Sequence, residues 1–179
     1  MPTNEIYSLN EFFQGLKDTG LKLGYQFQVT IEELDNLQFY ATSTTLPGKT
    51  LNVADIPYFG QNFKIPTSAV YSGEWTMSTR VDNALEIKKA LDKWMDNFAD
   101  LRSNGGGDKR VPSSTVIIDL LDSQLQNITD TFTLVGVWPS TMGDLTLDQS
   151  VSDPLTMDMT LQYQYWYKGT PGDSSDPLH

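Results

Sequence analysis

The side chains that most often carry nucleophilic or metal chemistry are almost absent from this chain. Among its 179 residues there is no Cys, and the one His is His179, the last residue. The absence of Cys excludes disulfides, zinc–thiolate sites and Cys nucleophiles. A terminal residue is rarely held in fixed geometry, so we expect neither a Ser-His-Asp triad nor a His-based metal site. The chemistry that remains would have to use carboxylates, Lys or Tyr.

Two short motifs look like ligand sites but lack what such sites require. Residues 105–109, Gly-Gly-Gly-Asp-Lys, do not have the Gly-Lys-Ser/Thr ending of a phosphate-binding loop, and they follow a predicted helix instead of a strand. Residues 173–176, Asp-Ser-Ser-Asp, offer too few oxygen ligands for a hard cation. We interpret the first as a surface loop and the second as part of a solvated tail. We therefore predict no catalytic residue, no metal site and no cofactor.

Carboxylates and tryptophans leave two other classes of protein open. Glycoside hydrolysis needs two carboxyl groups flanking the bond, so a chain with 23 acidic residues could be a carbohydrate-active or cell-wall hydrolase, although no pair is singled out. A monomeric β-sandwich binding module is the second alternative. Among the four Trp, we expect Trp94 and Trp75 in the core. Trp166 is out of phase with the apolar face of its strand, which makes it a candidate for contact with a neighbouring subunit.

Length, charge and hydropathy indicate one acidic domain that does not enter a membrane. The length fits a single domain on a prior of roughly 100–200 residues. No signal peptide is recognisable, and no apolar run approaches the roughly 18 residues of a membrane span. The net charge of -11 would repel nucleic-acid phosphates. We expect residues 1–168 to form the domain, with 1–20 as an N-terminal arm, and residues 169–179 to be a flexible tail.

Apolar residues at helical spacing predict two helices. In the arm, Ser8 and Glu11 have the spacing of a capping box, and the apolar residues around them predict a short N-terminal helix. The main helix is predicted over about residues 83–102, capped by Asp82 or Asn83. Its apolar stripe consists of Ile87, Leu91, Trp94, Phe98 and Leu101.

Alternation of apolar and polar residues predicts strands over most of the remaining chain. We expect residues 25–31 and 39–42 to pair through a turn at 35–36. A second hairpin is expected to have arms at 49–56 and 62–66, with Pro57 and Pro66 at the ends of the arms. Further strands are predicted near 74–79, 116–121, 132–138 and 155–165. The fold class that follows is mainly β, an antiparallel β-sandwich or barrel with one flanking α-helix.

A series of short segments, taken in order, resembles a known family. They are 41–48 (ATSTTLPG), 58–60 (YFG), 75–77 (WTM), 136–140 (GVWPS), 143–145 (GDL), and 159–161 (MTL) running into Tyr165-Trp166. With the strand 25–31 and the helix that contains Trp94, they cover about residues 25–167. This set resembles the T4-like tail tube proteins of contractile-tailed bacteriophages. Tube proteins of type VI secretion systems and of tailocins are similar in fold.

The resemblance implies a structural virion protein with no enzymatic activity. Six copies would form a ring whose strands join into a continuous inner β-barrel, and stacked rings would form the tail tube, the conduit for DNA ejection. The implied partners are further copies, the tail sheath protein, baseplate tube-initiator proteins and the tape measure protein, with viral DNA in transit and not specifically bound. The protein would be assembled in the host cytoplasm and located in the virion tail. The alternative is a baseplate tube initiator, or the tube of a tailocin or type VI-like contractile injection system.

Two sets of residues are predicted to serve such a tube. Polar faces of strands are candidates for the lumen, because they are neutral or acidic and basic residues there would bind DNA phosphates. These candidates are Gln26, Gln28, Thr30, Glu32, Glu74, Thr76, Ser78, Thr156, Asp158, Thr160, Gln162 and Gln164. The candidates for contacts between subunits or rings are Tyr58 and Phe59, in the hairpin 49–66, and Trp166.

Overall fold

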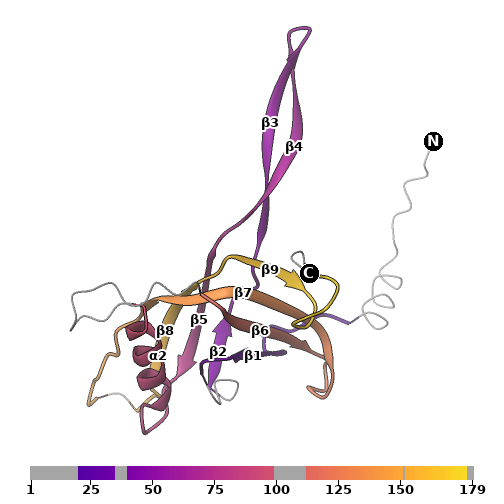
Figure 1. The fold of residues 1–179 in the computed structure, drawn as a ribbon. Coiled ribbons are helices and arrows are strands. Elements are labelled where there is room, and N and C mark those ends of the chain that lie inside the picture. The colour runs from indigo at the N-terminus through magenta and orange to yellow at the C-terminus, as the bar shows by residue number, and fades with distance from the viewer. Residues whose placement is uncertain (1–19, 35–39, 99–111, 151, 177–179) are drawn as a thin grey trace.

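The structure is a computed structural model that describes residues 20–34, 40–98, 112–150 and 152–176 (Figure 1). The described part is mainly antiparallel β with one α-helix, which confirms the predicted fold class. The predicted N-terminal helix lies outside the described residues. The elements are β1 (Phe27–Ile31), β2 (Ala41–Thr44), β3 (Lys49–Tyr58), β4 (Gln61–Tyr71), β5 (Glu74–Arg80), α2 (Glu86–Asp96), β6 (Ser114–Leu121), β7 (Ile128–Met142), β8 (Thr156–Gln162) and β9 (Tyr165–Lys168).

Seven of the described strands form one sheet around the long strand β7. The order is β1-β6-β7-β8-β5-β2, and β9 also pairs with β7. The first part of β7 lies between β6 and β9, whereas its last residues, from Trp138 to Met142, pair with β8. Gly136, at the change between the two parts, has a φ of 67°, a conformation that glycine adopts without steric cost. One strand therefore belongs to both halves of the sheet.

Among the described residues, one buried cluster includes side chains from both halves of the sheet and from the helix. Trp75 and Met77 of β5 lie in it with Met157, Met159 and Leu161 of β8, as their alternation predicted. From the other half come Val29, Ile31, Val116, Ile118 and Leu134, and from α2 come Ile87, Leu91 and Trp94. Trp75 and Trp94 are thus core residues, as predicted.

The helix α2 begins three residues later than predicted. The carboxylate of Asp82 accepts hydrogen bonds from the backbone N–H groups of Ala84, Glu86 and Ile87. Leu85, between Ala84 and Glu86, has a left-handed backbone conformation with a φ of 56°, so an extra turn precedes the helix. Asp82 still satisfies N–H groups of the first helical turn, as a capping residue does. Residues 99–102 of the predicted helix lie outside the described part.

The expected pairing of residues 25–31 with 39–42 is wrong. β1 pairs with β6, and β2 pairs with β5. In the β1–β6 register, Val29 faces Ile118 and Ile31 faces Val116, and all four side chains are buried. Long-range pairing therefore lets β-branched side chains pack across strands in the core, which a local hairpin would not have done.

The β3–β4 hairpin is present, with longer arms than predicted. Phe59 and Gly60 form its two-residue turn and have φ values of 48° and 76°, as a type I′ turn requires. Pro57 and Pro66 lie inside the arms, opposite Asn62 and Val53, and not at their ends as expected. In a two-stranded ribbon both strands are edges, so each Pro can sit where no ladder hydrogen bond is lost.

Residues 169–176 lie against the β7–β9 pair. The Gly169 N–H donates to the Thr131 carbonyl at 2.9 Å, and the Thr133 hydroxyl donates to the Gly169 carbonyl at 2.6 Å. Asp176 is buried, and the Tyr165 hydroxyl donates to its carboxylate at 3.3 Å. The expected flexibility of the tail 169–179 stays a prediction.

Candidate assembly surfaces

The lumen candidates on β5 and β8 share one face of the sheet. The antiparallel register places Glu74 opposite Gln162, Thr76 opposite Thr160, and Ser78 opposite Asp158. Directly opposite residues point to the same side of a sheet. The other side of both strands is buried in the core, so this side is a polar surface backed by a packed interior. Thr156 completes the set at the end of β8.

This polar surface carries a hydrogen bond between strands and charges of both signs. The Ser78 hydroxyl donates to the Asp158 carboxylate across the strands. Arg80, opposite Thr156, is also exposed on this side, although it is not one of the predicted lumen residues. Glu74 and Asp158 supply negative charge, so the surface is mixed and mostly neutral. Single-strand alternation could have identified Arg80, because it continues the sequence Glu74, Thr76, Ser78.

Neighbouring strands widen the polar face beyond the predicted residues. Ser43 of β2 lies opposite Ser78, and Thr141 of β7 lies opposite Thr160. Trp138 lies opposite Gln162 and is half-buried. Bulges in β2 and β7 hide the alternation of these strands, so only the register of the folded sheet assigns them to this face. We call the exposed side of β2, β5, β8 and residues 138–142 the polar face.

The remaining lumen candidates lie elsewhere. Gln28 and Thr30 of β1 pair with Asp119 and Ile117 of β6, in the other half of the sheet. Gln26 is only 3% exposed, and its side-chain oxygen accepts a hydrogen bond from the Leu23 N–H. Glu32 is exposed beyond the end of β1, and Gln164 is exposed at the bend between β8 and β9. The structure thus brings together seven candidates of the twelve, those of β5 and β8.

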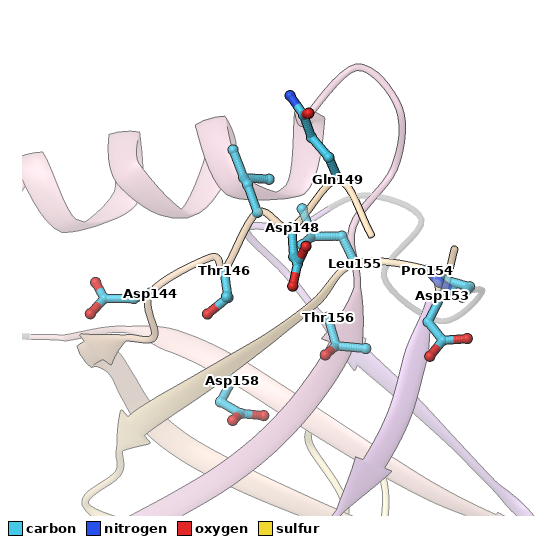
Figure 2. A pocket seen from close by; sticks show the side chains of 10 residues that line it. Asp144, Thr146, Asp148, Gln149, Asp153, Pro154, Leu155, Thr156 and Asp158 are labelled. Carbon is cyan, nitrogen blue, oxygen red and sulfur yellow. The ribbon is translucent and has the colours of Figure 1, made fainter. Parts of the chain in front are cut away.

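A groove with an acidic lining lies at the Thr156 end of the polar face. Its volume is about 900 Å³, and Asp144, Asp148, Asp153 and Asp158 line it together with neutral residues (Figure 2). The hydroxyl and then the N–H of Ser150 hydrogen-bond Asp148 and lower the pKa of its carboxyl group. Among the described residues, no group of three or more acidic or His side chains is arranged to hold a metal ion. The four carboxylates of the groove therefore add negative potential to this end of the polar face.

The β3–β4 hairpin projects from the body of the molecule and carries an exposed apolar face (Figure 1). In the described part, its strands pair only with each other. The register places Ile56 opposite Phe63 and Ala54 opposite Ile65, with Tyr58 next to the turn. The ring centroids of Tyr58 and Phe59 are 4.7 Å apart, and Phe59 is 91% exposed. Contiguous apolar surface of this kind marks an interaction site.

Trp166 makes its described contacts within its own chain. Its indole N–H donates to the Gly48 carbonyl at 3.1 Å. Its ring lies 6.2 Å from that of Tyr71 and 5.8 Å from that of Phe132, measured between centroids. It is half-buried, and contact with a neighbouring subunit stays a prediction.

No helix in the described ranges is both long and apolar enough to cross a membrane.

Comparison with known proteins points to a structural role. The phage tail tube protein family matches residues 7–169, and no curated protein sequence matches the chain. In fold, the chain is similar to a protein of the sheath–tube complex of the PVC extracellular contractile injection system (TM-score 0.64, 15% identity, 88% of this chain and 97% of that chain). It is also similar to the tube-terminating cap of the anti-feeding prophage (TM-score 0.63, 18% identity, 84% and 91%). A third similar structure is the PVC sheath/tube terminator (TM-score 0.62, 17% identity, 82% and 94%).

The family match covers most of the chain and agrees with the resemblance found in the short segments. It extends over both surfaces described above, the polar face and the β3–β4 hairpin. The role of the family is structural, as a component of the phage tail. This chain belongs to the phage tail tube protein family.

Proposed function

We propose that copies of this chain form hexameric rings that stack into the tail tube, and that the tube conducts viral DNA into the host. The observation that carries the proposal is the β3–β4 hairpin, whose apolar face has no partner within the described part of one chain. Water-exposed apolar surface of this extent is stabilised when another copy covers it. The hairpin is therefore an element of assembly.

The open edges of the sheet support the proposed ring. β1 and β2 end the strand order, so each has one side without a strand partner among the described elements. Unpaired N–H and C=O groups at such edges recruit further strands. A head-to-tail contact between identical copies closes into a ring when its rotation allows, and a closed ring leaves no free edge.

The polar face is the part of the chain that we place on the lumen. It is hydrophilic and largely neutral, with Glu74, Asp158 and Arg80 as its charges on β5 and β8. DNA phosphates bind to clusters of Lys and Arg through counterion release, and such binding would hold the DNA in place. A chain with a net charge of -11 and this face would let DNA slide past without specific binding.

Stacking of rings is the role that we assign to Tyr58 and Phe59. They stand at the tip of the hairpin, the part farthest from the body (Figure 1). Burying a large apolar side chain stabilises a contact by about 1.5–3 kcal/mol. Six hairpins per ring would multiply that contribution.

The remaining partners and the location complete the proposal. The tube would contact the tail sheath protein on its outside, baseplate tube-initiator proteins at one end and the tape measure protein within. It would be assembled in the host cytoplasm, without insertion into a membrane and without catalytic activity. A baseplate tube initiator, or the tube of a tailocin or type VI-like system, would use the same surfaces. Copy number in purified particles separates an initiator, present in one ring, from an abundant tube subunit.

The hairpin tip provides the test. We expect the purified chain to form tubes in negative-stain electron microscopy and the Tyr58→Ser/Phe59→Ser variant to remain folded but unpolymerised. Leu125→Ser is the matched control, because Leu125 is also exposed and lies in a turn of the main sheet. Normal tubes from the double variant would rule out the hairpin as the stacking element.

A further inference from the structure

Both ends of the β3–β4 hairpin are attached to one short corner of the sheet, residues 163–166, where β8 bends into β9. We propose that Tyr163 and Trp166 of this corner fix the direction in which the hairpin leaves the body. The inference rests on the proposed function for the hairpin's role in stacking. It assigns Trp166 a positioning role inside the subunit.

Trp166 holds the end of the hairpin that leads into β3. Its indole N–H donates to the carbonyl of Gly48, which directly precedes Lys49. The Trp166 ring packs edge-on against Tyr71, the last residue of β4. The Lys49 ammonium lies 5.7 Å from the centroid of the Tyr71 ring, a distance suited to a cation–π contact. Gly48, just before β3, and Tyr71, at the end of β4, are thus joined to the same indole, and Lys49 contacts it through the Tyr71 ring.

Tyr163 holds the end of the hairpin that leaves β4. Its hydroxyl and that of Ser72 are 2.7 Å apart, within hydrogen-bond distance. Its N–H donates to the Gly73 carbonyl at 3.0 Å. Tyr163 is itself buried in the core, so this attachment is made to a rigid part of the molecule.

The length of the hairpin makes its attachment consequential. β3 has 10 residues, and a strand rises about 3.3 Å per residue, so the arm is about 33 Å long. A small rotation at its base moves the tip by several times the displacement at the base. In the described part, β3 and β4 pair with no strand of the main sheet that could limit such a rotation. Two attachments on opposite arms limit it instead.

A hairpin that is already oriented in the free subunit lowers the free-energy cost of assembly. If only a fraction of the subunits hold the hairpin in the orientation that can bind, the apparent affinity equals the intrinsic affinity multiplied by that fraction. Holding the hairpin in one direction in the free subunit keeps this fraction high, as preorganisation does in general. Loss of the corner contacts should therefore raise the protein concentration at which tubes elongate, while leaving the stacking surface itself intact.

Spin labels can measure this orientation directly, because the chain has no Cys of its own. Lys64→Cys on β4 and Lys93→Cys on α2 are exposed label sites. Double electron–electron resonance is measured below the elongation threshold, the protein concentration at which tubes begin to elongate. With an excess of unlabelled chain, the distances then come from two labels on one chain. The test variant is Tyr163→Phe/Trp166→Phe, which keeps an aromatic ring at each position and removes the two side-chain hydrogen bonds. Trp166→Ala removes the ring as well.

Tyr167→Phe is the matched control. Tyr167 lies in β9, as Trp166 does. The substitution also removes a hydroxyl hydrogen bond, but that bond is to the Thr170 carbonyl and not to the hairpin. Circular dichroism checks that each variant is folded.

We expect a narrow distance distribution in the parent chain and in the control, and a broader one in the test variant, broadest in Trp166→Ala. The elongation threshold should rise about five-fold for each lost hydrogen bond. An unchanged distribution in folded Trp166→Ala would overturn the inference, even if tubes still form. A broadened distribution in a protein that forms no tubes under any condition would support the inference and count against the proposed function.

Discussion

At the scale of single residues, Asp82 shows how one carboxylate organises the start of α2. The backbone N–H of Glu86, followed by those of Ile87 and Ala84, holds the pKa of this carboxyl group below its ordinary value of 3.8. A carboxylate whose pKa is lower in the folded than in the unfolded state stabilises the fold above the unfolded pKa. That stabilisation is lost as the pH falls through the folded pKa.

Asp82→Asn should therefore change the acid dependence of stability. The amide keeps an oxygen acceptor for the N–H groups but carries no charge and does not titrate in this range. We expect a lower Tm than the parent at pH 7, and a difference that shrinks as the pH is lowered below about 4. Thermal unfolding from pH 7 to pH 3 measures it. Because Asp122 and Asp148 also have lowered pKa values and remain in both proteins, the difference isolates Asp82. A difference that stays constant with pH would contradict this assignment.

At the scale of elements, Gly136 lets β7 serve both halves of the sheet. Its φ of 67° is unfavourable for residues with a side chain, and a Cβ there would lie 2.6 Å from Cγ of Gln164. Gln164 belongs to the same bend that leads into Trp166. A side chain at position 136 therefore strains β7 and disturbs this bend.

Gly136→Ala should lower the free energy of unfolding by about 1–3 kcal/mol, the cost of a residue held in a sparsely populated conformation. Urea unfolding followed by Trp fluorescence measures it. Gly24→Ala is the control, because a Cβ at Gly24 meets nothing within 4 Å and its φ is not in the positive range. Equal stability of the two variants would show that β7 does not depend on glycine at this position.

Elements also show where sequence reasoning succeeded. Trp75 and Met77 alternate with polar residues, and so do Met157, Met159 and Leu161. This alternation predicted two strands and their buried faces, because each strand has one solvent-exposed side and one buried side. The β3–β4 hairpin was also predicted, but Pro57 and Pro66 were expected at the ends of its arms, so the predicted arms were shorter than the observed ones. Strand partners were not predictable in the same way, because pairing of β1 with β6 depends on residues about ninety positions apart.

The candidate surfaces were only partly predictable for the same reason. Seven of the twelve lumen candidates share the polar face, whereas Gln26 is buried by the local turn at Leu23. Trp166 seemed out of phase because the bend at Gln164 reverses which side of the strand faces the core. Its β7 partner is Leu134, which is fully buried. A bend within an apparently continuous alternation leaves no composition signal.

At the scale of the whole molecule, charge on the polar face should govern the passage of DNA. Thr76→Lys would place one added cation per subunit, and six per ring, on this face. We expect such tubes to assemble but to bind short duplex DNA at about 50 mM salt and to release it near 200 mM, as phosphate contacts do. Gln124→Lys, on the exposed turn between β6 and β7, adds the same charge away from the face. Salt-dependent retention on both tubes alike would show that the polar face does not line the channel.

Cryo-electron microscopy of the purified, assembled chain tests the proposed tube and its lumen most directly. We expect six-fold rings stacked into a tube, with β5 and β8 presenting Thr76, Asp158 and Thr160 to the channel and each β3–β4 hairpin reaching the adjacent ring. A tube with Lys and Arg on the channel wall and the polar face turned outward would contradict the assignment of the lumen. Dispersed monomers at every concentration would contradict the proposal that this chain builds a tube by itself.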